Sequence, residues 1–330
     1  MISLTERIDL LERLGNYMAG EDEEWILAKD HAVQRNAWFS PASIDMAVNG
    51  IVQQFLQKEL LTEWALSYPQ PAEAKKVGVV MAGNIPLVGF HDFLCGFITG
   101  HDLYIKLSSK DEVLLKHLGE KLVSWQPALA GTIHFAENLK GCDAYIATGS
   151  NNTARYFEQY FGKYPNIIRK NRTSVAVLDG NETPEQLYAL GKDIFSYYGL
   201  GCRNVTKVYL PQGYEIPKLL DALQPYQDII NHNKYKNNYD YFLAIYLLNK
   251  VPYLTNDFLL LVENKVPFSA VSVLHYEFYA DKTVLLHELQ YDDDIQCIVN
   301  NGHIQYGASQ TPALADYADG ADTMMFLSSL

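Results

Sequence analysis

One cysteine, Cys202, stands in a sequence context that suits a nucleophile. It follows the glycine-rich stretch 199–201 and precedes the polar pair Arg203-Asn204 and a β-branched run. We therefore expect its sulfur at a turn and not in a core. A thiol attacks a carbonyl carbon only as the thiolate, and positive charge on Arg203 or Lys207 would favour that form. The competing interpretation is a small residue that packs like any buried free cysteine.

The other three cysteines are expected to pack rather than to react. Cys95 lies inside the apolar segment 91–97, and Cys142 and Cys297 each lie beside a strand-like run. The chain has no CxxC pair and no two histidines at His-x-x-x-His spacing. Since the acidic run 292–294 is more simply a solvated turn, we predict neither a metal site nor a disulfide scaffold.

Two further segments end predicted strands and lead toward helices. In Gly83-Asn84-Ile85-Pro86 the Asn84 amide could donate a hydrogen bond to a developing oxyanion. Thr148-Gly149-Ser150 precedes a helix whose first N–H groups and positive dipole end would face a pyrophosphate. Each segment alone is compatible with a turn that only caps a helix, and a lone Gly-Asn-x-Pro indicates such a turn more often than an oxyanion donor. Lys106 and Lys110 add positive charge at the same predicted edge, although most lysines are merely solvated.

A parallel sheet would bring these residues to one edge. From residue 76 on, short β-branched or apolar runs alternate with helical segments, the pattern of successive βα units. We expect strands at 77–81, 103–107, 144–147 and 174–178, and later at 205–210, 258–262, 271–279 and 284–289. Helices are expected at 4–14, 41–66, 86–99, 111–124, 151–161, 183–197, 216–223 and 239–248.

The fold class predicted from this pattern is α/β, with two domains, as the length of 330 residues also favours. The polar, glycine-containing break Asp179-Gly180-Asn181 is the expected boundary. Residues 1–179 would then hold N-terminal helices and a Rossmann-type parallel sheet, and residues 180–305 a second α/β domain with Cys202. The segment 306–330 is not assigned to either domain.

The charge of the chain excludes some partners. A formal net charge of −13 and a pI near 5.1 repel phosphate backbones and anionic headgroups, so we expect no nucleic-acid partner and no membrane surface. No apolar stretch approaches the roughly 20 residues that span a bilayer, so no membrane insertion is expected. The first residues do not read as a signal peptide, and a cytoplasmic location is the default expectation.

Taken in order, four segments resemble the landmarks of the aldehyde dehydrogenase superfamily. These are Gly83-Asn84-Ile85-Pro86, Lys106-Leu107-Ser108-Ser109, Thr148-Gly149-Ser150 and Gly199-Leu200-Gly201-Cys202. The superfamily has Asn-x-Pro, Lys-Pro-x-Glu, Thr-Gly-Ser and Gly-Gln-x-Cys in these places. Within it, the chain looks most like the LuxC-type long-chain acyl-CoA reductases, in its short length and in its C-terminal segment 310–320. The resemblance covers residues 76 to 330.

This resemblance implies roles for individual residues. Cys202 would be the nucleophile, and Asn84 would form an oxyanion hole with the Cys202 backbone N–H. Lys106 would bind the adenosine ribose, and Gly149 and Ser150 would lie beside the pyrophosphate. The resemblance also implies a homo-oligomer, and LuxC-type reductases act with acyl-transferring protein partners.

Two departures from the superfamily pattern bear on the chemistry. Hydrolytic members carry Glu-Leu-Gly-Gly-Lys, whose Glu activates water, whereas this chain has Ile168 in the place of that Glu. Ser109 stands where NAD-preferring members often place a Glu on the ribose, and Ser109 with Lys110 would tolerate a 2′-phosphate. We therefore expect NADPH, with NADH possible. The basic run Arg169-Lys170-Asn171-Arg172 would be either a phosphate-binding patch or a solvated loop.

The predicted function is NADPH-dependent reduction of an acyl-CoA, most simply a fatty acyl-CoA, to the aldehyde through an acyl-Cys202 intermediate. The alternatives are another reductase of the superfamily, with an acyl phosphate or aldehyde substrate, and a nucleotide-binding protein without catalysis. An aromatic segment, residues 235–246, would line an acyl tunnel or, more simply, pack in a core.

Overall fold

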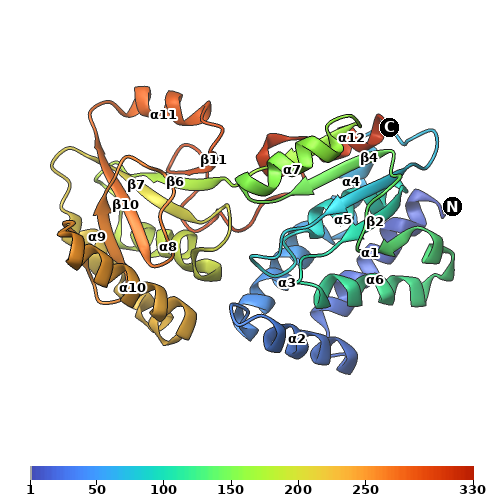
Figure 1. The fold of residues 1–330 in the computed structure, drawn as a ribbon, viewed down its shortest axis with the longest axis horizontal. Coiled ribbons are helices and arrows are strands. Elements are labelled where there is room, and N and C mark those ends of the chain that lie inside the picture. Colours follow the sequence, from blue (N-terminus) through green and yellow to red (C-terminus); the bar gives the residue numbers. More distant parts are fainter. Residues whose placement is uncertain (1) are drawn as a thin grey trace. The chain divides into compact units, whose positions relative to one another are not determined.

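The computed structural model describes residues 2–330, which form two compact units (Figure 1). Unit 1 comprises the residues up to Asn171 together with Pro312–Leu330, and unit 2 comprises Arg172–Thr311. The predicted α/β fold class is confirmed, since each unit is a largely parallel sheet with helices packed on it.

Unit 1 contains a five-stranded parallel sheet of order β3-β2-β1-β4-β5. Its strands are β1 (Lys76–Val80), β2 (Asp102–Lys106), β3 (Ile133–Phe135), β4 (Ala144–Thr148) and β5 (Asn166–Arg169). The chain builds outward from β1 to β3 and then returns to add β4 on the other side of β1. The strand order therefore reverses between β1 and β4, the place where doubly wound α/β sheets bind nucleotides.

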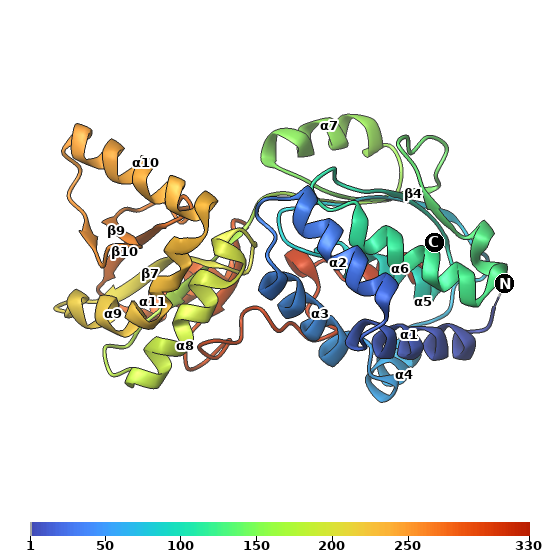
Figure 2. The same ribbon diagram turned by 90° about the horizontal axis from the view of Figure 1, so that it is seen from below.

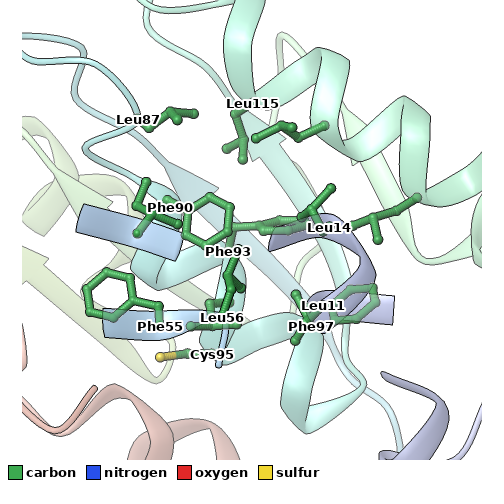
Figure 3. Packing of buried hydrophobic residues seen from close by; sticks show 14 of the residues in the cluster. Leu11, Leu14, Phe55, Leu56, Leu87, Phe90, Phe93, Cys95, Phe97 and Leu115 are labelled. Atoms are coloured by element: carbon green, nitrogen blue, oxygen red, sulfur yellow. The ribbon is translucent and has the colours of Figure 1, made fainter. Parts of the chain in front are cut away.

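Helices cover both faces of this sheet. The helices of unit 1 are α1 (Leu4–Ala19), α2 (Glu23–Arg35), α3 (Pro41–Phe55), α4 (Lys58–Leu66), α5 (Phe90–Thr99), α6 (Val113–Trp125), α7 (Asn151–Phe161) and α12 (Thr323–Ser328). Helix α7 lies on one face, and α5 and α6 lie on the other (Figure 2). The main core, between the sheet and the N-terminal helices, is rich in leucine and phenylalanine (Figure 3).

Unit 2 contains a six-stranded sheet of order β11-β6-β7-β10-β9-β8, parallel except for the short edge strand β8. Its strands are β6 (Thr173–Val177), β7 (Val205–Pro211), β8 (Leu254–Thr255), β9 (Leu260–Glu263), β10 (Val273–Tyr279) and β11 (Ile295–Val299). Its helices are α8 (Pro184–Phe195), α9 (Ile216–Leu223), α10 (Asn233–Asn249) and α11 (Lys282–Gln290).

The structure differs from the sequence prediction in several segments, among them the predicted helix 41–66, which is divided into α3 and α4 at Leu56-Gln57. The expected boundary at residue 179 places strand 174–178 in the first domain, but β6 pairs with β7 and β11 of the second sheet, so the chain changes units at Arg172. The predicted strand 284–289 is wrong, because helix α11 occupies it. Asp281 starts that helix by accepting hydrogen bonds from the N–H groups of Thr283 and Val284.

The segment left unassigned by the sequence divides between the units. Residues up to Thr311 belong to unit 2, and Pro312–Leu330 belong to unit 1. The returning segment is tied to unit 1 by buried polar contacts, among them His101 Nε2 with the Leu327 carbonyl (2.9 Å) and Trp64 Nε1 with the Tyr317 hydroxyl (2.9 Å). None of the helices formed by residues 2–330 is long and apolar enough to span a bilayer.

Candidate functional site

Three candidate binding segments lie at the carboxyl edge of the unit 1 sheet. Asn84 follows β1, Lys106 ends β2 and is followed by Ser109 and Lys110, and Thr148 ends β4. The register aligns these ends, since Val80 of β1 pairs with Lys106 of β2 and with Ala147 of β4. The structure thus brings the predicted cofactor residues to one edge, beside the reversal of strand order.

The loop that carries Asn84 is a turn and not the start of a helix. Helix α5 begins at Phe90 with Gly89 as its N-cap, so the predicted helix start at Pro86 is wrong, and Asn84 does not cap α5. The reason is Leu87, whose φ of 56° lies in the left-handed region. The Leu87 side chain is nevertheless buried, and it contributes to the core shown in Figure 3.

A buried carboxyl group that the sequence analysis missed holds this loop. Asp111 Oδ2 accepts a hydrogen bond from the Leu87 N–H at 2.7 Å, and Asp111 is only 7 % exposed. Burial raises the pKa of Asp111 to about 7, although the Leu87 N–H opposes this shift. Its other oxygen, Oδ1, has no hydrogen-bond partner among residues 2–330. No pattern in the sequence distinguishes Asp111 from a surface acid.

The loop after β2 presents positive charge. Lys106, Ser109 and Lys110 are exposed, and neither lysine forms an ion pair with any residue of the described chain. The neighbouring acid Glu112 lies 3.5 Å from Arg35. These three side chains are therefore exposed to solvent, and their role in binding a cofactor stays a prediction.

The Thr148-Gly149-Ser150 segment combines a cap with an open helix start. Ser150 Oγ accepts from the Thr153 N–H at 3.3 Å and caps α7. The Gly149 N–H donates to the Arg169 carbonyl at 3.2 Å, so it is used within the protein. The N–H groups of Asn151 and Asn152, in the first turn of α7, are those that the helix itself leaves for an anion.

The predicted basic patch at residues 169–172 is wrong for Arg169. Its guanidinium is buried and pairs with Asp92 of α5, with 2.6 Å between Nη1 and Oδ2. Its Nη2 donates to Thr323 Oγ1 at 2.8 Å. Lys170 pairs with Glu158 at 3.1 Å on the surface. Arg169 thus fastens helices α5 and α12 to β5, and it does not face solvent where phosphates would bind.

Cys202 lies in unit 2, on a turn directly before β7, as predicted. It is half-buried, whereas Cys95, Cys142 and Cys297 are buried. Ser174 Oγ of β6 donates to the Cys202 carbonyl at 3.0 Å, and Asn204, which is fully buried, closes the turn by donating its N–H to the Gly201 carbonyl at 3.0 Å. Burial raises the pKa of Cys95 well above its usual value, which makes that thiol inert.

The two cations expected near the thiol have other partners. Arg203 Nη1 donates to Cys297 Sγ at 3.3 Å. Lys207 is fully buried, and its ammonium lies 2.6 Å from Glu277 Oε2 and 2.7 Å from the Lys265 carbonyl. The prediction that Lys207 supplies net positive charge to Cys202 is therefore not supported, because Glu277 neutralises that charge.

The aromatic segment of α10 serves partly as core. Tyr235 and Tyr239 are buried, and Tyr239 packs with Leu260 and Val262. Tyr241, by contrast, is 60 % exposed. Among residues 2–330 no group of three or more histidine, cysteine, aspartate or glutamate side chains is arranged to hold a metal ion.

Comparison with solved structures identifies the fold as that of aldehyde dehydrogenases. Aldehyde dehydrogenase 21 from Physcomitrella patens, in complex with succinate, is 12% identical over 91% of this chain and 74% of its own, with a TM-score of 0.67. The NAD+ complex of a Bacillus cereus aldehyde dehydrogenase is 12% identical over 90% and 72%, with a TM-score of 0.65. The NADP complex of the NADP-dependent glyceraldehyde-3-phosphate dehydrogenase from Bacillus halodurans is 12% identical over 91% of this chain and 74% of its own, with a TM-score of 0.61. No protein-family model and no curated protein sequence matches the chain.

Proposed function

We propose that this chain is a LuxC-type reductase of the aldehyde dehydrogenase superfamily, which reduces a fatty acyl-CoA to the aldehyde with NADPH through an acyl-Cys202 intermediate. The observation that carries the proposal is Cys202 itself. In an aldehyde dehydrogenase fold, it is the one cysteine of the four that is not buried, and it lies on a turn closed by hydrogen bonds. Such a thiol is accessible to a substrate carbonyl.

In the proposed reaction the Cys202 thiolate attacks the carbonyl carbon of the thioester. The bond between that carbon and the coenzyme A sulfur then breaks, and coenzyme A leaves as its thiolate, which takes up a proton. Bound NADPH supplies the hydride that reduces the acyl carbon. Collapse of the resulting oxyanion breaks the carbon–Sγ bond, so the aldehyde is released and the Cys202 thiolate is restored.

Residue 168 supports reduction over hydrolysis. Ile168 is a half-buried residue of β5, paired with Ala147, and an isoleucine side chain cannot accept a proton from water. Without a general base at this position, attack of water on the acyl-cysteine is not assisted. The intermediate would therefore persist long enough to be reduced or to exchange with another thiol.

The carboxyl edge of the unit 1 sheet fits a nicotinamide dinucleotide. Lys106 would bind the adenosine ribose, Ser109 and Lys110 would accept the 2′-phosphate, and the start of α7, with Thr148, Gly149 and Ser150, would bind the pyrophosphate. The fit rests on the reversal of strand order and on two exposed lysines without acidic partners in the described chain. The absence of a carboxylate at Ser109 favours NADPH over NADH.

Asn84 is proposed as a donor to the oxyanion, together with the Cys202 backbone N–H. Negative charge develops on the substrate oxygen in both chemical steps, so the loss of one donor slows both. Asn84→Ala should lower kcat by about 10²–10³, as removal of one oxyanion-hole donor does elsewhere. A homo-oligomer and an acyl-transferring protein partner remain part of the proposal through the resemblance alone.

The test follows NADPH absorbance while the purified protein is offered acyl-CoA thioesters from acetyl to palmitoyl. Cys202→Ala is compared in parallel, and Cys142→Ala, which removes a buried thiol, is the matched control. We expect oxidation of NADPH that depends on acyl-CoA, vanishes in Cys202→Ala and survives in Cys142→Ala. Undiminished reduction by Cys202→Ala would refute the covalent mechanism. Activity only with acyl phosphates or free aldehydes would show that acyl-CoA is not the substrate. Inactivity with every acyl donor would favour a nucleotide-binding protein without catalysis.

A further inference from the structure

We propose that Asn204 is a positioning residue for Cys202, which fixes the backbone of the cysteine turn from inside the protein. The inference rests on the proposed function, because it assigns Asn204 a role in the chemistry of Cys202. Asn204 lies two residues after the cysteine and is fully buried. The resemblance to known motifs does not include this residue.

The Asn204 carboxamide joins the cysteine turn to the preceding helix. Its Oδ1 accepts from the Gly201 N–H at 2.8 Å. Its Nδ2 donates to the carbonyls of Ser196 at 2.8 Å and Asp193 at 3.1 Å, with Ile194 at 3.3 Å. The acceptors lie at the C-terminal end of α8, where carbonyl groups lack partners within the helix. One side chain thus satisfies both the helix end and the turn that carries Cys202.

The chain between these two points needs such a restraint. Tyr197 (φ 52°), Tyr198 (φ 59°) and Gly199 (φ 78°) are three consecutive residues in the left-handed region. Only glycine adopts this conformation without steric cost, so the two tyrosines are held there by their surroundings. The Tyr198 ring stacks on His232, with 4.1 Å between the centroids. The hydrogen bonds of Asn204 span this strained segment, from Ser196 on one side to Gly201 on the other.

A second side chain restrains the turn from the neighbouring strand. Ser174, which is also fully buried, donates its Oγ to the Cys202 carbonyl, and its register partner in β7 is Val205. The carbonyl of Cys202 and the N–H of Gly201 are therefore both fixed by buried side chains. They flank the peptide group that carries the Cys202 N–H, and the Gly201 carbonyl of that group accepts a hydrogen bond from the Asn204 N–H at 3.0 Å. All three peptide groups around Cys202 are therefore held, which restricts the direction of the Cys202 N–H and of its Cα–Cβ bond.

The consequence for catalysis is directional. The Cys202 sulfur must approach the carbonyl carbon of the substrate from the direction in which that carbon accepts a nucleophile. At the same time the Cys202 N–H must point to the carbonyl oxygen of the substrate. A displacement of about 1 Å at a reacting group costs about 10² in rate. Loss of the Asn204 carboxamide should therefore lower kcat by about 10². It should leave the KM for NADPH unchanged, because the residues proposed to bind NADPH belong to unit 1.

The experiment compares Asn204→Ser and Asn204→Asp with the matched control Asn256→Ser. The aspartate keeps the acceptor for Gly201 but cannot donate to the carbonyls of α8. Asn256 is another asparagine of unit 2 that bonds two backbone groups through its side chain, the Leu220 carbonyl and the Leu259 N–H. Three quantities are measured on each full-length variant: kcat and KM with acyl-CoA, amide hydrogen exchange of the peptide 196–204, and the pH dependence of Cys202 alkylation by iodoacetamide.

We expect both Asn204 variants to speed exchange in residues 196–204, to change the alkylation profile and to lower kcat by about 10². Asn256→Ser should do none of these, even where it lowers the melting temperature equally. Unchanged exchange and kcat in both Asn204 variants would overturn the inference, and so would an equal loss of kcat in Asn256→Ser. If the wild type reduces no thioester while exchange and alkylation still change as expected, the proposed function fails and the positioning role stands. If Asn204→Asp does not fold, Asn204→Ser decides.

Discussion

Replacing Asp111 by asparagine should change how the stability of unit 1 depends on pH. The carboxyl pKa is raised from its usual 3.8 to about 7 by burial, so the folded state holds the proton to higher pH than the unfolded state. The contribution of the Asp111 proton to the free energy of unfolding is therefore fully present below about pH 4, and it is lost as the pH rises through about 7. At about 1.4 kcal/mol per pKa unit the loss totals roughly 4 kcal/mol, of which about 2.5 kcal/mol falls between pH 5 and pH 8.

The Asp111→Asn variant removes this titration and keeps an oxygen that accepts from the Leu87 N–H. The free energy of unfolding of the variant minus that of the wild type should therefore be about 2.5 kcal/mol larger at pH 8 than at pH 5, because only the wild type loses stability in this range. Urea unfolding followed by tryptophan fluorescence measures unit 1 alone, because all four tryptophans (Trp25, Trp38, Trp64 and Trp125) belong to it. Glu112→Gln, at the exposed neighbour, is the control and should show no such change. If the free energies of unfolding of Asp111→Asn and wild type differ by the same amount at pH 5 and pH 8, the reasoning is refuted.

Two further predictions concern the basic residues. Arg169→Met should destabilise unit 1 by about 3–5 kcal/mol, because it leaves the Asp92 carboxylate buried without its partner, and the double variant with Asp92→Leu should recover most of the loss in the same fluorescence assay. Lys110→Glu should raise the KM for NADPH roughly tenfold while changing the KM for NADH much less, because a carboxylate beside Ser109 repels a 2′-phosphate. An equal effect on both cofactors in steady-state assays would contradict the assignment of the phosphate to this loop.

Local signals predicted the elements that carry the candidate site. The helix at 151–161 has the predicted bounds because Ser150 is a good N-cap directly after an apolar strand. The strands that end near Asn84, Lys106 and Thr148 were predicted within a residue, since each is a short apolar run between polar breaks. Their common edge follows from the parallel order of βα units.

What the sequence could not predict depends on contacts between distant residues. The charged run at 169–172 looks uniform, but Arg169 is buried because Asp92 and Thr323, which lie 77 and 154 residues away, fold against it. Asp111 likewise looks like any surface acid until the loop with Leu87 covers it. Segment 284–289 is a different case, because its Asp281 cap is a local signal that the strand assignment overlooked, while the packing of Leu289 near Val175 and Val177 of β6 is a distant contact.

The two loops that carry the proposed catalytic residues share one arrangement, a left-handed backbone segment beside a buried polar side chain. Leu87 follows Asn84 in the left-handed region, and Tyr197 and Tyr198 precede Cys202 in the same region, at roughly 1–2 kcal/mol for each residue that is not glycine. In the first loop the buried Asp111 carboxyl accepts a hydrogen bond from the Leu87 N–H. In the second, the buried Asn204 carboxamide bonds Ser196 and Gly201, which lie on either side of the strained residues. Glycine at these positions would remove the strain, but it would also remove the buried Leu87 and Tyr197 side chains. Strain that is retained and restrained by buried hydrogen bonds is what a site needs when an amide or a thiol must point in one direction.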